Sequence, residues 1–215
     1  MVKIITAAQA AELIQSGDSL MVGGFIMAGT PLTLIDAICD RGLDGFTLIT
    51  NDAGFPGKGT GRLICEKRVR HMIASHIGTN KEAGNLMNAG EMKVDLVPQG
   101  TLAERIRAAG AGLGGFLTPT GVGTQVEEGK QIITRNGVKY LLEEPLRAKV
   151  ALIRAHKADK AGNLTYRGAT RNFNVPMATA ADLVIAEVGK IVETGSMDPD
   201  EVVTPSIFVD YLVQR

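Results

Sequence analysis

Apolar residues occur in short blocks along this chain, and stretches with helical patterning separate the blocks. The continuous apolar runs predict buried strands at residues 19–22, 46–50, 69–75, 94–97, 150–153 and 183–186. Helices are predicted at residues 31–40, 82–89 and 102–109, the first with an apolar stripe of Leu34, Ile35 and Ile38. Buried strands that alternate with helices indicate a mostly parallel sheet covered on both faces. We therefore predict an α/β fold with an open, mostly parallel sheet and helices on both of its faces.

Local signals refine the ends of these elements. Thr6 and Gln9 have the spacing of a capping box, and Gly17 closes the helix that follows them. Thr30 is expected to cap the next helix with Pro31 in its first position, and Thr101 is expected to cap the helix 102–109. The dipeptide 136–137, Asn-Gly, favours a type I′ turn, so 132–142 is predicted to form a small β-hairpin.

Composition limits the class of protein. The 215 residues suffice for one domain, predicted over residues 1–215, and 23 Lys and Arg balance 23 Asp and Glu, which argues against nucleic-acid binding. No apolar run approaches the ~20 residues of a membrane span, and the N-terminus does not read as a signal peptide. Cys39 and Cys65 lie far apart and are expected to be unpaired thiols. We expect a soluble cytoplasmic protein that does not bind a membrane.

Polar or glycine residues follow four of the predicted strands, at the point where each strand ends. They are Gly23-Gly24, Asn51-Asp52, His76 and Gln99. In parallel sheets, ligands bind beyond the carboxyl ends of the strands. Each of these residues could be an ordinary turn residue, but together they predict a shared rim around a ligand site.

The glycine loop that runs from Val22 to Pro31 is the most informative part of this rim. Glycine lets the backbone turn sharply and lets another molecule approach main-chain N–H groups. A strand, a glycine loop and a helix N-terminus together are suited to an anionic or thioester-bearing ligand. The alternative is a plain tight turn between a strand and a helix.

Other chemical motifs lack their required context. The G-x-G-x-x-G spacing at 110–115 follows a helix instead of a strand, so we do not interpret it as a dinucleotide site. The three histidines, His71, His76 and His156, do not have metal-ligand spacing, and no metal site is predicted. A Gly-x-Ser-x-Gly elbow is also missing, which removes the usual sign of serine hydrolysis.

Several stretches together resemble the family I coenzyme A transferases, over nearly the whole chain. They are Gly23-Gly24-Phe25 with Gly29 and Pro31, and residues 51–54, 75–80, 97–107, 112–121 and 162–166. One departure is Ser16, where the family commonly has an acidic or amide residue before the glycine. The resemblance is strongest to the alpha subunits that act on acetate and acetoacetate, and it implies the NagB/RpiA-like fold of this family.

The resemblance also implies a chemistry that is shared between two chains. A beta subunit, in an expected α2β2 assembly, would carry a nucleophilic glutamate that receives coenzyme A from an acyl-CoA in a ping-pong reaction with short-chain carboxylates. Coenzyme A and acyl-CoA would be substrates, with no tightly bound cofactor. The look-alikes of the Glu-x-Gly motif at Glu82, Glu128 and Glu193 do not continue with the beta-subunit pattern. The nucleophile is therefore not expected in this chain.

Site residues follow from the same resemblance. Gln99 would lie on the oxyanion side, where a neutral amide can donate a hydrogen bond at any pH. Asn51 would contact substrate, although an Asx turn is the simpler explanation for it. The loop facing coenzyme A, or packing on the beta subunit, would comprise Gly23, Gly24, Phe25, Ile26, Met27, Ala28 and Gly29.

An alternative function remains open at this point. Sugar-phosphate isomerases and sugar-phosphate-sensing modules share this type of fold, and the fold alone does not separate them. An isomerase would need its own acid and base and a phosphate cradle in this chain, and neither is convincing in the sequence.

Overall fold

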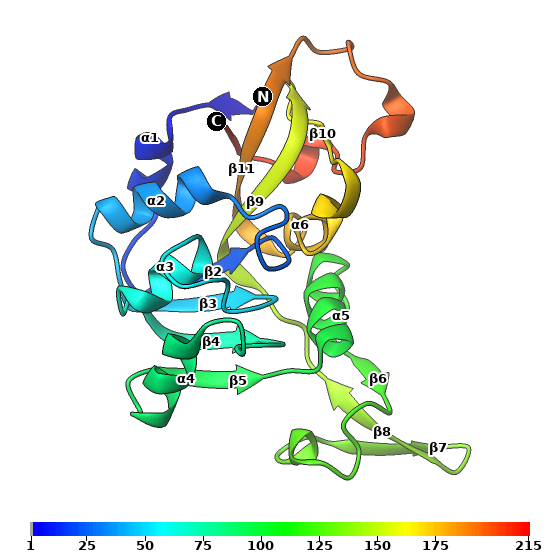
Figure 1. Ribbon diagram of the computed structural model, residues 1–215. Helices are drawn as coiled ribbons and strands as arrows, with labels where there is room; N and C mark the ends of the chain where they lie inside the picture. Colours follow the sequence, from blue (N-terminus) through cyan, green and yellow to red (C-terminus); the bar gives the residue numbers. More distant parts are fainter. Residues whose placement is uncertain (1) are drawn as a thin grey trace.

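One twisted sheet runs through the computed structural model, which describes residues 2–215 (Figure 1). Its strand order is β1-β12-β11-β9-β2-β3-β4-β5, and all pairs along this path are parallel. A short strand, β10, pairs antiparallel with β9. The strands are β1 (Lys3–Ile4), β2 (Ser19–Val22), β3 (Phe46–Thr50), β4 (Val69–Ala74), β5 (Lys93–Leu96), β9 (Ala148–Asp159), β10 (Leu164–Thr165), β11 (Ala181–Val192) and β12 (Tyr211–Gln214).

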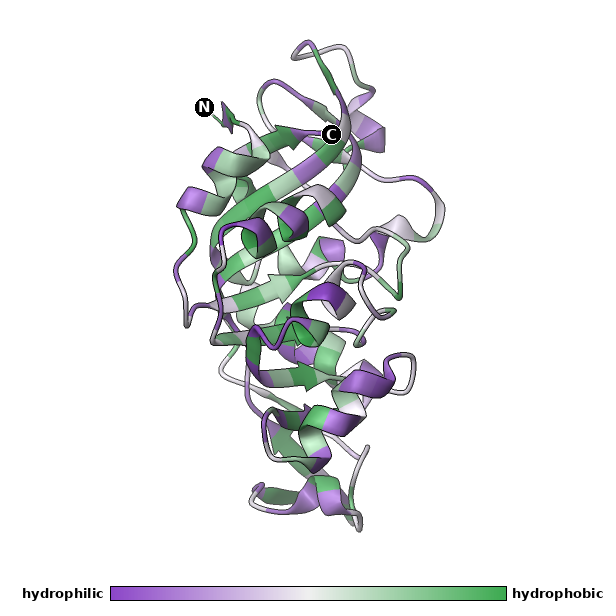
Figure 2. Ribbon diagram, turned by 60° about the vertical axis from the view of Figure 1, so that its left-hand side comes forward, coloured by the Kyte–Doolittle hydropathy of each residue, from purple (hydrophilic) through white to green (hydrophobic). Residues whose placement is uncertain are grey.

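Helices cover both faces of this sheet, as predicted. Helices α1 (Ala7–Glu12), α2 (Leu32–Asp40), α3 (Thr60–Cys65) and α4 (Lys81–Asn88) contribute to one core cluster, and α5 (Gln99–Gly110) and α6 (Asn174–Met177) contribute to the other. The apolar colouring is concentrated in the strands of the sheet, whereas the helices show polar residues outward (Figure 2). Four 3₁₀ turns complete the described elements: η1 (Gln125–Glu127), η2 (Gly168–Arg171), η3 (Pro199–Glu201) and η4 (Ser206–Phe208).

Strand β9 explains why the core has two halves. Val150 and Leu152 point into one cluster, and Ala151 and Ile153 point into the other. This alternation follows from the period of two of a β-strand, so a strand covered on both faces is apolar at every position. The predicted runs at 150–153 and 183–186 were too short, because β9 and β11 each extend over 12 residues.

A second, smaller sheet lies beside α5 and away from the main sheet (Figure 1). It contains the predicted hairpin, β7 (Ile132–Arg135) and β8 (Val138–Glu143), whose turn has positive φ at Asn136 and Gly137. A third strand, β6 (Phe116–Thr118), pairs antiparallel with β8. Strand β6 was not predicted, because it is short and follows a glycine-rich loop.

Two predicted helix caps are wrong, whereas the capping box of Thr6 and Gln9 is confirmed. Helix α2 begins after Pro31, and the Thr30 hydroxyl donates backward to the Ile26 carbonyl oxygen (3.2 Å) instead of capping the helix. Helix α5 begins at Gln99, two residues before the predicted cap Thr101. Pro98 fixes the backbone ahead of Gln99, so the helix needs no side-chain cap to begin there.

Candidate functional site

The carboxyl ends of β3, β4 and β5 bring the predicted rim residues together. Asn51 follows β3 directly, and its carbonyl oxygen accepts a hydrogen bond from the Ser75 amide (3.0 Å) beyond β4. Gln99 opens α5 beyond β5, and its Nε2 donates to Asn51 Oδ1 (2.8 Å). The backbones of His76 and Asp52 pair in an isolated parallel β-bridge. The imidazole ring of His76 lies close to Gly78. The strand-end pattern therefore located a real cluster of polar side chains.

A buried carboxylate fixes the direction of these amides. A carboxylate can only accept, so the Asn51 Nδ2 that lies 2.7 Å from Asp52 Oδ2 must be the donor. The oxygen of the Asn51 amide then faces Gln99 and accepts from its Nε2. A glutamine amide has two N–H groups, and this bond uses one of them. Because the Gln99 side chain is exposed, its second N–H group can donate to a bound molecule.

Asp52 also holds the tip of the glycine loop. Its Oδ2 accepts the Ile26 amide (2.6 Å), and its Oδ1 accepts the Gly54 amide (2.8 Å). Ile26 has φ = 56°, a left-handed conformation that is unfavourable for a β-branched residue. A buried carboxylate with three donors supplies the interaction that holds this conformation in place. This role of Asp52 was not predicted from the sequence, where Asp52 is only the neighbour of Asn51 at the strand end.

The glycines at the base of the loop are required by close packing. A Cβ atom at residue 23 would lie 1.9 Å from Asn174 Oδ1. At residue 24, where φ is 123°, it would lie 2.4 Å from Thr30 Oγ1. Both glycines are buried, whereas Phe25 and Ala28 at the tip are exposed. The packing explanation thus accounts for the base of the loop, and the tip is the part that is open to a ligand or partner.

Glu187, and not the predicted Thr30, caps α2. The Glu187 Oε2 atom accepts the amides of Thr33 (2.8 Å) and Leu34 (3.2 Å) at the N-terminus of the helix. A carboxylate is favourable there because the helix dipole is positive at that end. Burial raises the pKa of Glu187, opposed by its hydrogen bonds to these two amides. A charged residue that continues the apolar run 183–186 was the signal available in the sequence.

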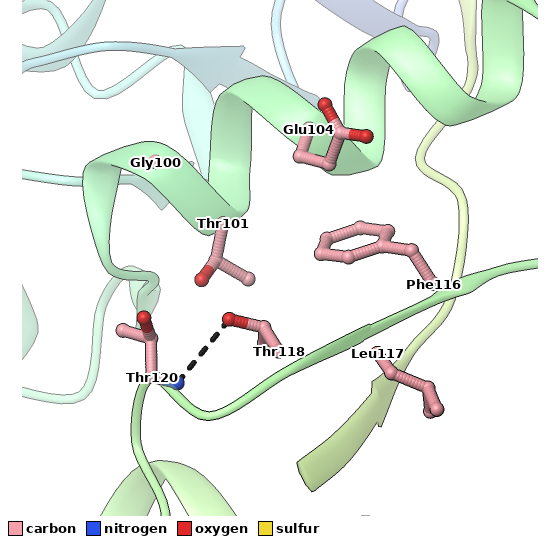
Figure 3. A pocket seen from close by; sticks show the side chains of 7 residues that line it. All are labelled: Gly100, Thr101, Glu104, Phe116, Leu117, Thr118 and Thr120. Atoms are coloured by element: carbon pink, nitrogen blue, oxygen red, sulfur yellow. Dashed lines mark hydrogen bonds between the residues drawn. The ribbon is translucent and has the colours of Figure 1, made fainter.

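A hollow of about 480 Å³ opens beside the first turns of α5 (Figure 3). Thr101 and Thr118 point toward one another across it, and the Phe116 ring lies below Glu104. The Thr120 amide donates to Thr118 Oγ1 (3.2 Å), and this hydrogen bond orders the backbone where the chain leaves β6. The lining combines hydroxyl groups with apolar side chains, from Gly100, Thr101, Glu104, Phe116, Leu117, Thr118 and Thr120. Gly100 follows Gln99 directly, so the hollow adjoins the amide cluster.

The three Glu-x-Gly look-alikes have local roles. Glu82 lies in the first turn of α4 and accepts from Asn85 Nδ2 (3.0 Å). Glu128 follows η1 in an exposed loop. Glu193 is exposed and pairs with Lys160 (2.5 Å) beyond the end of β11.

Metal-binding groups and membrane-spanning helices are absent from the described residues. Across residues 2–215, no group of His, Cys, Asp and Glu side chains could hold a metal ion. In the same range, no helix has both the length and the apolar character that a membrane span requires. Cys39 is buried and Cys65 is half-buried, and both are free, as predicted.

Comparison with known sequences defines the family. The family described as Coenzyme A transferase matches residues 4–215, and the chain belongs to this family. It is 54% identical to the acetate CoA-transferase subunit alpha of Escherichia coli K12 over 98% of this chain and 96% of that protein. It is 44% identical to the acetoacetyl-CoA:acetate/butyrate CoA transferase alpha subunit of Clostridium acetobutylicum, over 99% of this chain and 98% of that one.

Solved structures confirm the fold. An acyl-CoA transferase from E. coli O157:H7, in a thioester complex with CoA, superposes with a TM-score of 0.87 at 23% identity. The match covers all of this chain, which spans about half (47%) of that longer chain. Glutaconate coenzyme A-transferase from Acidaminococcus fermentans gives a TM-score of 0.85 at 20% identity, over 99% of this chain and 75% of that one. The predicted fold class and the resemblance to coenzyme A transferases are confirmed.

Proposed function

We propose that this chain is the alpha subunit of a CoA-transferase that moves coenzyme A between short-chain carboxylic acids, with acetate, acetoacetate and butyrate as the substrate class. The observation that carries this proposal is the 54% identity to an acetate CoA-transferase alpha subunit over 98% of the chain. The relatives named above are transferase subunits, which does not favour a sugar-phosphate isomerase or sensor.

A beta subunit would supply the nucleophile. Relatives of this chain are named alpha subunits, so a partner chain completes the enzyme, and we propose an α2β2 assembly. The carboxylate of a beta-subunit glutamate attacks the acyl-CoA carbonyl, which forms an acyl-glutamyl anhydride and releases the CoA thiolate. The thiolate then attacks the glutamyl carbonyl, giving a glutamyl-CoA thioester and the free acid. An acceptor acid reverses both steps, so no other reactant is needed.

Each attack places negative charge on a carbonyl oxygen, and Gln99 is suited to stabilise that charge. Two hydrogen bonds, from Asn51 to Asp52 and from Gln99 to Asn51, form a relay that orients the Gln99 amide at the rim. The second N–H group of Gln99 Nε2 is not used by this relay. A donor held in place before the reaction begins costs no reorganisation when the oxyanion forms. Asn51 acts in this account by orienting Gln99, and it contacts substrate less directly. The exposed loop tip, Phe25–Ala28, would face coenzyme A or the beta subunit.

The first test is reconstitution with the beta subunit. The alpha chain alone should not transfer CoA, because the nucleophile is not in it. Co-expression with the beta chain should give transfer from acetyl-CoA to acetoacetate or butyrate. Transfer at a normal rate by the purified alpha chain alone would overturn the subunit assignment.

The second test removes the Gln99 amide. Gln99→Ala should lower kcat and kcat/KM together by about 10²–10³, since the bond acts in the transition state. Gln15→Ala is a matched control, because Gln15 is exposed and precedes β2, on the side of the amino ends of the strands. Melting temperatures should stay close to that of the wild-type complex for both variants. Normal turnover in the Gln99→Ala complex would remove Gln99 from the site.

A further inference from the structure

Strands β9 and β11 extend past the core, and one face of each changes character at the carboxyl end. On β9, Val150 and Leu152 pack in the core, and the next positions on the same face are Arg154 and His156. On β11, the residue beside His156 on this face is Gly189. Ligands of parallel sheets bind at the carboxyl ends of the strands, so an arginine and a histidine at this place need an explanation.

A hollow of about 220 Å³ opens at this end of the sheet. It is lined by Arg154, Ala155, His156, Arg167, Thr170 and Gly189. A Cβ atom at residue 189 would meet only the His156 carbonyl oxygen, at 3.0 Å, so the lack of a side chain on Gly189 keeps the floor open. The Thr170 hydroxyl donates to the Arg167 carbonyl oxygen (2.8 Å) and orders η2, the turn that brings Arg167 to the hollow.

Ion pairs do not neutralise the arginines of this hollow, although Glu187 attracts Arg154 through space. Neither Arg154 nor Arg167 forms an ion pair within residues 2–215. Glu187 is the acidic neighbour on the same face, and its Oε2 is committed to the amides of α2. The whole chain has a net charge of zero, so general basicity does not explain the cluster.

We propose that this hollow binds a phosphate group, held by the guanidinium groups of Arg154 and Arg167 with His156 as a further donor. Guanidinium forks match phosphate oxygens in a bidentate geometry, and charge-assisted bonds of this kind are strong. The phosphates of coenzyme A are one source of such a group, and this source rests on the proposed function. Free inorganic phosphate is the other source.

The hollow is physically connected to the glycine loop. Arg154 donates from one guanidinium nitrogen to the Thr30 carbonyl oxygen (3.3 Å), directly after the loop. The segment that carries Arg167 continues to Asn174, whose Nδ2 donates to the Gly29 carbonyl oxygen (3.0 Å). A phosphate bound here therefore stabilises the same loop that lies at the rim of the transferase site.

Arg167→Ala in the alpha–beta complex is the sharpest test, because Arg167 is exposed and forms no ion pair among residues 2–215. The KM for acetyl-CoA should rise about tenfold with little change in kcat, since ground-state binding is lost. The KM for acetyl-pantetheine, which carries no phosphate, should stay within about twofold. Arg171→Ala is the matched control, because Arg171 is an exposed arginine of the same turn that does not line the hollow. Ionic strength is held constant throughout.

The arms of the experiment distinguish the two sources. A KM effect restricted to acetyl-CoA supports binding of the coenzyme's own phosphates, and 3′-dephospho-CoA then shows which phosphate is bound. An unchanged KM, together with inorganic phosphate that raises the melting temperature of the wild type and not of Arg167→Ala, supports free phosphate. Equal effects on both thioesters, equal effects of the two arginine variants, or no effect of either variant in both assays overturns the proposal. An inactive wild-type complex would contradict the proposed function, and the phosphate melting assay would still be readable.

Discussion

The tip of the glycine loop and its junction with α2 are each held by a buried carboxylate, and the two carboxylates differ in how many hydrogen bonds they accept. At the tip, both oxygens of Asp52 accept hydrogen bonds, from the Ile26 and Gly54 amides and from Asn51. Where the loop enters α2, Glu187 uses only Oε2, and its buried Oε1 has no partner among residues 2–215. Burial raises the pKa of Glu187 accordingly.

This difference predicts separate effects on turnover and on stability. Asp52 belongs to a chain of hydrogen bonds that ends at the exposed Gln99 amide, so a change there alters the geometry at the rim. Glu187 ends at a helix terminus and reaches no exposed polar group through its hydrogen bonds. We therefore expect changes at Asp52 to reduce turnover and changes at Glu187 to act mainly on folding.

Among changes to the glycine loop and its two carboxylates, the largest effect is expected for Asp52→Asn. An amide has one acceptor side and one donor side, so its NH₂ group must face one of the backbone or side-chain donors that now point at Asp52. Turnover of the alpha–beta complex should fall about 10²-fold, comparable to the loss of one oxyanion donor. Asp210→Asn is a control, since Asp210 also accepts a backbone amide, that of Val184 (2.8 Å), at the opposite edge of the sheet. A normal kcat in the folded Asp52→Asn complex would break the proposed link between the loop tip and Gln99.

A smaller, pH-dependent effect is expected for Glu187→Gln. A carboxyl group whose pKa is raised by folding binds more protons in the folded chain, so stability falls as pH rises from the usual glutamate range toward the raised pKa. Glutamine can still accept the two amides of α2 and does not titrate. In denaturant titrations, the difference in unfolding free energy between the variant and the wild type should therefore shift in favour of the variant as the pH rises above the usual glutamate range. A difference that is independent of pH would show that Glu187 does not titrate in this window.

Thr30→Val tests the stretch between the two carboxylates. The buried Thr30 hydroxyl donates to the Ile26 carbonyl oxygen (3.2 Å), and valine keeps the shape without this bond. Loss of one such bond should cost about 1 kcal/mol of unfolding free energy. Turnover should change by less than about threefold, because the Asp52 clamp remains. A drop in kcat as large as that of Asp52→Asn would show that the whole loop, and not its tip, sets the site geometry.

The smallest effect is expected for Ile26→Gly. Glycine removes the left-handed strain of about 1–2 kcal/mol at φ = 56° but adds freedom to the unfolded chain, and these changes nearly cancel. The melting temperature should change by only a few degrees in either direction. A large loss of stability would indicate that the Ile26 side chain, more than its backbone, holds the loop.

Much of the fold could be predicted from sequence because its strands are covered on both faces. The apolar runs at 19–22 and 46–50 match β2 and β3, and Asn136-Gly137 forms the predicted turn. The rule that ligand sites lie at the carboxyl ends of parallel strands also predicted that Asn51 and Gln99 lie close together, and the two side chains are hydrogen-bonded. The long-range partners could not be predicted, because residues 154 positions apart, such as Thr33 and Glu187, meet only through the sheet order. The same reason explains why Thr30 was mistaken for the cap of α2.

The most direct test of the account is a double-mutant cycle between Asp52→Asn and Gln99→Ala, measured as kcat of the alpha–beta complex. If Asp52 acts by orienting the Gln99 amide, its replacement has little left to disturb once that amide is gone. We therefore predict that the fold-decrease in kcat caused by Asp52→Asn is at least ten times smaller in the Gln99→Ala background than in the wild type. Two effects that multiply to the full product of the single variants would contradict the relay from Asp52 to Gln99.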